Sequence, residues 1–247
     1  MQNKIQSFLI SYWFKKIDYN PKEKIDILSD SIKTVIDTPL LYNSEDVNKL
    51  IGMPRIEGMS SDKKSFFSMS LINASLRYEI KSDMDKDEVI MLINNYSQLF
   101  FDVLKDVYNV DIVYTSIRID NIVENNESVY FLANKLNLRS NNYEDISLKR
   151  GFIKDDYYIN YTLGTGREYN FNVSRNQNSL DADLYDQTLV LSISEAELNK
   201  EYILVTVEVN DRYSFNKNKD YRTRKDEIRG MILEIKEILE KEKYFDI

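Results

Sequence analysis

The chain has 247 residues, enough for one large domain or two small ones, and 33 basic against 41 acidic side chains give a formal net charge of −8. It contains no cysteine and no histidine, which excludes disulfides, thiolate nucleophiles, Ser–His–Asp triads and metal sites built on imidazole or thiolate. The negative charge also disfavours a protein that coats nucleic acid by bulk electrostatics, although it leaves room for a local basic patch.

Hydrophobic residues make up 43% of the chain and charged residues 30%, as in ordinary globular proteins. No apolar run reaches the roughly 18 residues of a membrane span. The first four residues, Met1–Lys4, do not begin the charged and then apolar pattern of a secretory signal. We therefore expect a cytoplasmic protein with no membrane partner.

The first elements are predicted by β-branched and capping residues. Lys4–Ile17 is rich in β-branched and aromatic residues and predicts a strand. The run from Asn20 through Pro21 to Glu23 matches a capping box with proline at the first helical position, so a helix is expected next. Its apolar face would comprise Ile25, Leu28, Ile32, Val35 and Ile36. A short helix is predicted over Ser44–Ile51.

The middle of the chain alternates strands and helices. Ser65–Ile80 predicts one long strand or a tight hairpin, and Asp83 is the expected cap of a long helix over Lys86–Tyr108. Val110–Val123 predicts a strand with alternating faces. A polar connector follows, with one short helix at Val129–Leu136.

Several strands and a closing helix are predicted after the connector. The strands are Ile146–Ile153, Tyr157–Leu163, Arg167–Ser174, Leu189–Ile193 and Tyr202–Val209. Gly164 and Gly166 have the composition of a hairpin turn between two of them. The closing helix is expected over Tyr221–Lys243.

These elements predict an α+β fold in which antiparallel sheet is covered by long amphipathic helices. Each half of the chain runs from strands into a long helix, so two similar lobes are one arrangement. The lobes would be residues 1–124 and 146–247, joined by the polar connector 125–145, with packing as a single domain as the alternative.

One candidate for catalysis is an acidic pair followed by a lysine. Glu79 and Lys81 stand at a predicted strand end, with Asp62 upstream. Two carboxylates and a lysine are what a Mg²⁺-dependent nuclease needs to hold the metal and orient a water. A Glu-x-Lys pattern also arises by chance in a chain this rich in charge, and solvated strand-end charges are the favoured interpretation.

Two further motifs have simpler interpretations than a ligand site. Asp181, Asp183 and Asp186 form an acidic cluster without the offsets of an EF-hand, which favours a solvated loop. The glycines of Leu163–Arg167 lack the frame of a phosphate-binding loop, and a turn that needs positive φ explains them. We expect neither a cofactor nor a resident metal.

The stretch Asn210–Lys225 interleaves cations with aromatic rings. Such a pattern is typical of a mobile loop, of a protein interface or of a nucleic-acid contact, and all three remain open. The residues singled out are Arg212, Tyr213, Phe215, Lys217, Lys219, Tyr221, Arg222 and Arg224.

Tyrosines of the second predicted sheet are a second candidate surface. Tyr157, Tyr158, Tyr161 and Tyr169 are expected to be partly exposed, and amphipathic aromatics on a sheet face can form a recognition surface. A different group of aromatics is assigned to the core: Tyr12, Trp13, Phe14, Phe66, Phe67, Phe100 and Phe101. The closing helix either buries its apolar stripe inside the fold or pairs with a second copy as a homodimer.

The order of elements resembles a sporadically distributed bacterial family of unknown function. The resemblance rests on Phe8–Phe14, on the block Phe66–Tyr108, on Thr115–Ile122 with its sequence TSIRIDNI, and on Ile203–Val209 with the closing helix. Such proteins are scattered among mobile and defence-associated genes, which implies an interaction role and supplies no catalytic residues.

The sequence therefore favours a non-enzymatic interaction module with a protein partner, such as an inhibitor, adaptor or chaperone-like binder in a bacterial or phage conflict system. The alternatives are the Mg²⁺-dependent nuclease and a nucleic-acid-binding protein that uses the basic and aromatic stretch.

Overall fold

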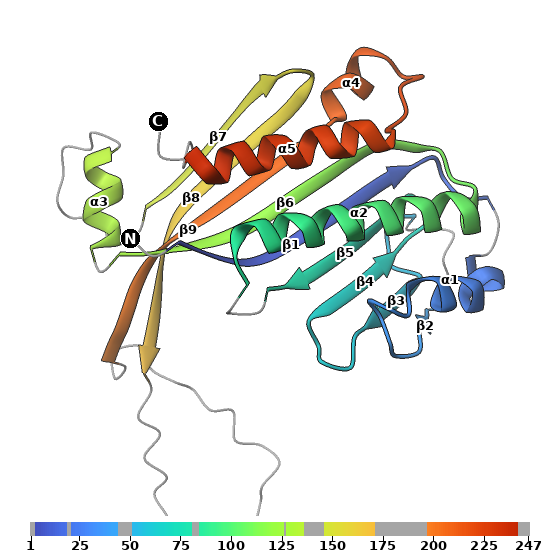
Figure 1. Ribbon diagram of the computed structural model, residues 1–247, viewed down its shortest axis with the longest axis horizontal. Helices are drawn as coiled ribbons and strands as arrows, with labels where there is room; N and C mark the ends of the chain where they lie inside the picture. The colour runs from blue at the N-terminus through green and yellow to red at the C-terminus, as the bar shows by residue number, and fades with distance from the viewer. Residues whose placement is uncertain are drawn as a thin grey trace, which may run out of the picture.

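The computed structural model describes residues 3–18, 21–43, 51–80, 84–125, 127–135, 146–170 and 197–241. Within them, nine strands form one antiparallel sheet in the order β2-β3-β4-β5-β1-β6-β9-β8-β7 (Figure 1). The strands are β1 (Asn3–Phe14), β2 (Leu41–Tyr42), β3 (Ile56–Met59), β4 (Ser65–Met69), β5 (Asn73–Glu79), β6 (Ile112–Glu124), β7 (Ser147–Lys154), β8 (Tyr157–Asn170) and β9 (Glu197–Asn210). The predicted α+β class and antiparallel sheet are confirmed.

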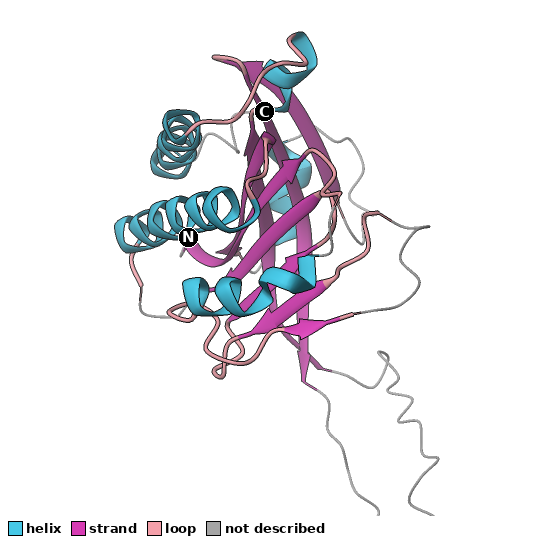
Figure 2. Cartoon of the chain, turned by 90° about the vertical axis from the view of Figure 1, so that its right-hand side faces the viewer, coloured by secondary structure: helices cyan, strands magenta, loops and turns pink. Residues whose placement is uncertain are grey.

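The helices are a short 3₁₀ turn at Pro21–Lys24, α1 (Ile25–Ile32), α2 (Lys86–Tyr108), α3 (Ser128–Lys135), α4 (Arg212–Lys217) and α5 (Lys225–Lys241). Helices α1, α2 and α5 all lie on the same side of the sheet (Figure 2). In the described part of the chain, the opposite side carries no long helix, and we call it the open face.

Alternation along the strands decides which side chains meet the helices. In β1, Phe8, Ile10 and Tyr12 are buried under α2, and the hydroxyl of Tyr12 donates a hydrogen bond to the carbonyl oxygen of Ser97 at 2.6 Å. Trp13 lies in the strand between Tyr12 and Phe14, which are both buried on the helix side. Its side chain therefore points to the open face, where it is half-buried. The expectation that Trp13 and Phe66 belong to the core is wrong, since Phe66 is also on the open face and 42% exposed.

The cap of α2 differs by two residues from the predicted one. Asp85 is the N-cap: its carboxylate accepts from the backbone N–H of Glu88 at 2.8 Å, and the Glu88 carboxylate accepts from the Asp85 N–H at 3.0 Å. Asp83 lies outside the described residues. A capping box needs glutamate three residues after the cap, and Lys86 occupies that place relative to Asp83.

The predicted turn at Gly164–Gly166 is wrong, because β8 runs through it without a break and neither glycine has positive φ. A Cβ on Gly166 would come within 2.2 Å of the Tyr202 ring on β9, so the glycine makes room for that ring. The turn joins β7 to β8 instead, at Asp155 and Asp156, whose φ angles are 48° and 70°. These are the left-handed values that two-residue hairpin turns require.

The closing helix begins at Lys225, four residues later than predicted, and part of the preceding stretch forms α4. Its apolar stripe is buried inside the fold, with Ile228, Met231, Ile235 and Ile238 fully covered. Homodimerisation through this helix stays a prediction. The predicted helix at Ser44–Ile51 falls, except for its last residue, outside the described residues, and the strand at Leu189–Ile193 lies wholly outside them.

One sheet joins the two halves of the chain, because β6 from the first half pairs with β9 from the second, as in Val123 opposite Ile203. The division into two lobes stays a prediction. Across the described ranges, no helix is both long enough and apolar enough to cross a membrane.

Candidate functional site

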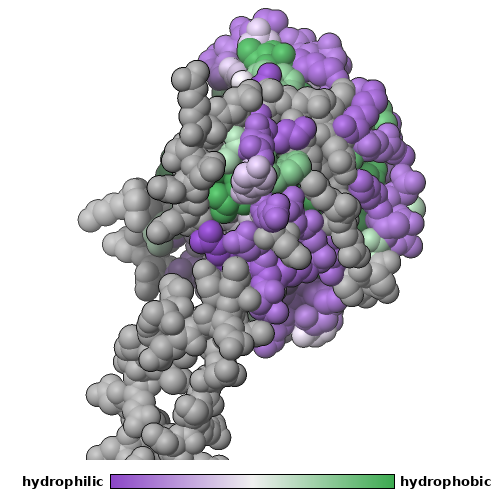
Figure 3. All heavy atoms as spheres, turned by 90° about the vertical axis from the view of Figure 1, so that its left-hand side faces the viewer, coloured by the Kyte–Doolittle hydropathy of each residue, from purple (hydrophilic) through white to green (hydrophobic). Residues whose placement is uncertain are grey.

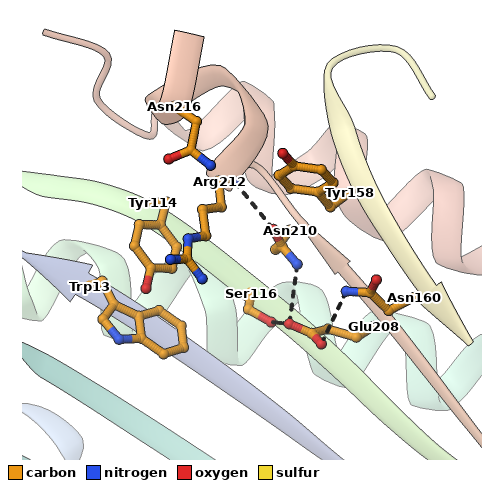
Figure 4. Close-up of a pocket in the computed structure, with 9 residues that line it drawn as sticks. All are labelled: Trp13, Tyr114, Ser116, Tyr158, Asn160, Glu208, Asn210, Arg212 and Asn216. Carbon is orange, nitrogen blue, oxygen red and sulfur yellow. Dashed lines mark hydrogen bonds between the residues drawn. The ribbon is translucent and has the colours of Figure 1, made fainter. Parts of the chain in front are cut away.

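A pocket of about 400 Å³ opens on the open face where α4 overhangs the sheet (Figure 4). Four neighbouring strands, β1, β6, β9 and β8, supply its floor, and α4 supplies its roof. The lining residues are Trp13, Tyr114, Ser116, Tyr158, Asn160, Glu208, Asn210, Arg212 and Asn216.

An aromatic stack with a cation on it forms one wall. Trp13 and Tyr114 stand side by side on β1 and β6 with ring centroids 4.6 Å apart and planes 14° apart. The guanidinium carbon of Arg212 lies 5.6 Å from the Tyr114 centroid, within cation–π range. Phe215 of α4 also reaches Tyr114, with centroids 6.0 Å apart. The wall therefore holds Arg212 in a defined orientation.

A carboxylate held by neutral donors lies on the floor. Glu208 accepts hydrogen bonds from the Ser116 hydroxyl at 2.7 Å, from the Asn210 amide at 3.1 Å and from the Asn160 amide at 3.5 Å. The amide oxygen of Asn210 in turn accepts from the backbone N–H of Arg212 at 3.3 Å. This network orders the floor and ties it to the start of α4.

Asp211 anchors the roof. Its fully buried carboxylate accepts from the Thr115 N–H at 2.6 Å, the Thr223 hydroxyl at 2.6 Å and the Tyr221 hydroxyl at 2.8 Å. Burial raises the pKa of Asp211 to about 6, against the opposing effect of these three hydrogen bonds, which favour the charged form. Since Asp211 directly precedes Arg212, the anchor sets where the arginine emerges.

The rest of the predicted basic and aromatic stretch divides into two groups. The first lies beside the pocket: Tyr213 meets Tyr158 edge-on with centroids 5.4 Å apart, and Lys217 lies 4.8 Å from the Tyr213 centroid. Lys219 lies 4.2 Å from the centroid of Phe215. These cations cover aromatic faces of α4 and extend the surface next to the pocket.

The second group has structural partners. Tyr221 is bound to Asp211, and burial, followed by the charge of Asp211, raises its pKa. Arg222 pairs with Asp111 at 3.4 Å and donates to two backbone carbonyls. Arg224 makes a two-point contact with Glu227 at the start of α5. These three residues secure the connection from α4 to α5.

The four predicted tyrosines do not share a face, because neighbours in a strand alternate. Tyr158 is on the open face and lines the pocket. Tyr157 is on the helix face, where its hydroxyl donates to the carbonyl oxygen of Glu227 at 3.4 Å and where burial raises its pKa to about 12. Tyr161 is only 7% exposed, so the expectation of exposure is wrong for it. Tyr169 lies in β8, paired with Leu198, and its side chain is outside the described set.

The proposed nuclease residues have local partners. Asp62 sits in the turn between β3 and β4, where it accepts from the Ser60 hydroxyl at 2.6 Å and from the Lys64 N–H at 3.1 Å. Glu79 ends β5, and its oxygen lies 3.8 Å from the nitrogen of Arg77 with both side chains more than half exposed. The contacts of Asp62 are those of a turn, and the contact of Glu79 is that of a solvated strand end.

Lys81 lies outside the described residues, as do Asp181, Asp183 and Asp186. Where the structure describes the chain, no three acidic side chains gather closely enough to hold a metal ion.

Sequence patterns do not point to five of the lining residues, which are Trp13, Tyr114, Ser116, Asn160 and Glu208. Asn210 and Asn216 lie within the predicted basic and aromatic stretch but are not among its cations and rings. The alternation in β6 does place Tyr114 and Ser116 on one face, but sequence alone cannot say that no long helix of the described chain covers this face. Two contacts that build the pocket, Trp13 to Tyr114 and Tyr114 to Arg212, join residues about a hundred positions apart.

Elsewhere, the end of the molecule where α3 lies presents a mainly hydrophilic surface, broken by small hydrophobic patches (Figure 3). The groove between α2 and α5 is lined by apolar residues that include Met91 and Leu233, both more than half exposed. The pocket on the open face is thus the place where aromatic rings, a guanidinium and a carboxylate converge.

No protein-family model and no curated protein matches the chain, so its function has to be inferred from the pocket itself.

Proposed function

We propose that the chain is a protein-interaction module that binds a partner protein through the pocket on the open face. The observation that carries this proposal is the gathering of Trp13, Tyr114, Tyr158 and Arg212 around one concavity on the open face. Tryptophan, tyrosine and arginine are the residues that most often dominate the binding energy of protein interfaces.

The rigidity of the pocket supports the same function. Two strands and the Asp211 anchor fix the stacked rings and the arginine, so little side-chain entropy remains to be lost on binding. The polar rim around the rings, with Asn160, Asn210 and Asn216, is also typical of an interface that is solvated when free.

The two alternatives have less support in the geometry. Asp62 is engaged in a turn and Glu79 in a surface ion pair, and no three acidic side chains gather in one place within the described chain. A nucleic-acid strand would meet Glu208 in the pocket and a protein of net charge −8. The conflict setting and the cytoplasmic location follow from the resemblance and from composition, and both stay predictions.

The test is affinity co-purification from a bacterial lysate, with and without phage infection, using wild-type bait and two double variants. The pocket variant is Tyr158→Ala with Arg212→Ala. The matched control is Tyr130→Ala with Arg229→Ala, which removes the same residue types from exposed sites on α3 and α5.

We expect a near-stoichiometric protein that survives nuclease treatment, binds wild type and control, and is lost with the pocket variant. Recovery of nucleic acid alone, or a partner retained equally by both variants, would overturn the proposal.

A further inference from the structure

The Tyr114 ring orients the guanidinium of Arg212, which pairs with no carboxylate of the residues that the structure describes. Among the described residues it makes no hydrogen bond or ion pair, and its contact is the face of Tyr114. The other arginines nearby behave differently: Arg222 pairs with Asp111, and Arg224 with Glu227. The pocket thus contains a fork of N–H donors that the Tyr114 ring holds in place.

A second donor lies on the same side of the roof. Asn216 follows Arg212 by four residues, one helical turn along α4, and both line the pocket (Figure 4). The amide oxygen of Asn216 accepts from Lys219 at 3.4 Å, which leaves its two amide hydrogens available. Arg212 and Asn216 therefore both supply side-chain donors to the lining of the pocket.

We propose that the pocket binds an acidic side chain, aspartate or glutamate, of the partner protein. Its carboxylate would accept from the Arg212 guanidinium and the Asn216 amide, and the aliphatic stem would pack beside Trp13. This inference rests on the proposed function and names the group on the partner that the site recognises. A planar guanidinium and a carboxylate match in geometry through two parallel hydrogen bonds.

Charge within the pocket favours a singly charged carboxylate over a phosphate group. Arg212 is the one cation among the lining residues, whereas Glu208 contributes a negative charge. Because the charges of Arg212 and Glu208 cancel, a bound carboxylate leaves one negative charge in excess in the pocket, whereas a dianionic phosphate leaves two.

The shape of the lining favours a side chain over a chain terminus. Sites that capture a terminal carboxylate commonly use a nest of backbone N–H groups. Here the donors are side chains that overhang an open sheet, and the Arg212 N–H is already taken by Asn210. A segment passing over the open face could insert one acidic side chain from above.

Trp13 makes the pocket directly observable. It is the single tryptophan of the chain, and it stacks on the ring that carries Arg212. Its intrinsic fluorescence therefore reports on this pocket without a contribution from any other indole.

The experiment titrates the full-length chain at constant ionic strength with four probes while tryptophan emission is recorded. The probes are acetyl-Ala-Glu-Ala-amide, the matched acetyl-Ala-Gln-Ala-amide, acetyl-Ala-Ala-Ala with a free carboxyl terminus, and inorganic phosphate. We expect a saturable change with the glutamate peptide and at least tenfold weaker binding of the glutamine peptide. A stronger response to the free terminus or to phosphate would overturn the assignment to an acidic side chain.

Substitutions of Arg212 test whether the fluorescence response comes from binding at this pocket. Arg212→Met should abolish the response and Arg212→Lys should weaken it severalfold, because lysine keeps the charge and loses the fork. Arg77→Met is the matched control: it removes one arginine from the same face outside the pocket and should leave the affinity unchanged. An unchanged response in Arg212→Met would overturn the inference.

The two proposals fail separately. If a partner depends on the pocket in co-purification but the glutamate peptide gives no response, only the carboxylate assignment falls. If the peptide binds through Arg212 and no protein partner depends on the pocket, the interaction function falls and the chemistry of the pocket stands.

Discussion

The hydroxyl of Tyr221 donates a hydrogen bond to Oδ2 of Asp211, 2.8 Å away and ten residues earlier in the chain. This bond closes a loop that carries the whole of α4 and with it the roof of the pocket. Thr223 donates to the same oxygen at 2.6 Å, and the backbone N–H of Thr115 on β6 donates to the other. The roof is thus fastened to the sheet through one buried carboxylate.

Tyr221→Phe should lower the free energy of unfolding by about 1–3 kcal/mol, because it removes a donor from a buried charged acceptor. Urea unfolding at pH 7.5, followed by far-UV circular dichroism, measures the change. Tyr130→Phe is the matched control: Tyr130 is 59% exposed on α3 and should stay within about 0.5 kcal/mol of wild type. Equal stability of the two variants would show that the bond to Asp211 contributes nothing.

Asp211 should also make stability depend on pH in a particular direction. Its pKa is about 6 in the fold, above the ordinary 3.8 that it regains on unfolding. Between these values the folded state holds a proton that the unfolded state has released. The stabilisation that Asp211 contributes is therefore fully present below pH 4 and is lost as the pH rises to 6. The loss in the free energy of unfolding is roughly 3 kcal/mol, since the folded and unfolded pKa values differ by about two units.

Asp211→Asn removes this titration and keeps an oxygen for the Thr115 N–H. The measurement is the difference in unfolding free energy between wild type and variant at half-unit steps from pH 4 to pH 7, since the other carboxylates cancel in the difference. We expect wild type to lose stability relative to the variant across that interval. A constant difference would show that the pKa of Asp211 is ordinary.

Gly166→Ala should destabilise the fold because its Cβ would come within 2.2 Å of the Tyr202 ring. The matched control is Gly164→Ala on the same strand, whose Cβ meets only the Ile146 carbonyl oxygen, at 3.8 Å, and which should be tolerated. In a Tyr202→Ala background the penalty at Gly166 should disappear. The double-mutant cycle should give a coupling of about 0.5–3 kcal/mol, and additive effects would contradict the steric explanation.

Asp85→Ala should cost about 1 kcal/mol by opening the capping box of α2. Asp87→Ala serves as the comparison: it removes an acid from the same first turn, where the carboxylate of Asp87 makes an exposed ion pair with Lys236 at 2.8 Å. Such pairs contribute little, so this variant should change the unfolding free energy by less than about 0.5 kcal/mol. Chemical denaturation of both variants in one buffer separates the cap from the charge.

Elements with a strong local pattern were predictable from sequence. The stripe of α2 and the alternation of β6 appear in the spacing of apolar residues, and the predicted bounds lie close to the observed ones. Gly164 and Gly166 misled the prediction because glycine is common both in turns and where another side chain approaches closely. Only the position of Tyr202 across the sheet distinguishes the two uses.

The site was predictable in part. Arg212 belongs to the predicted basic and aromatic stretch and Tyr158 to the tyrosines of the second predicted sheet, and both line the pocket. The sequence predicts Trp13 to be in the core, since it cannot say which face of a central strand a helix will cover. No local sequence pattern indicates that Glu208 belongs to a site. Its place on the floor follows from the pairing of β9 with β6 and β8.

The strand order has a consequence for synthesis on the ribosome. β6 lies in the middle of the finished sheet, yet its neighbour β9 is translated much later. Val123, for example, cannot pair with Ile203 until that part of the chain has been made. Until then the nascent chain exposes a thirteen-residue edge rich in isoleucine and valine, a template for pairing with another nascent chain. Slow translation of the intervening segment should therefore favour aggregation, and chaperones that bind nascent chains should raise the soluble yield.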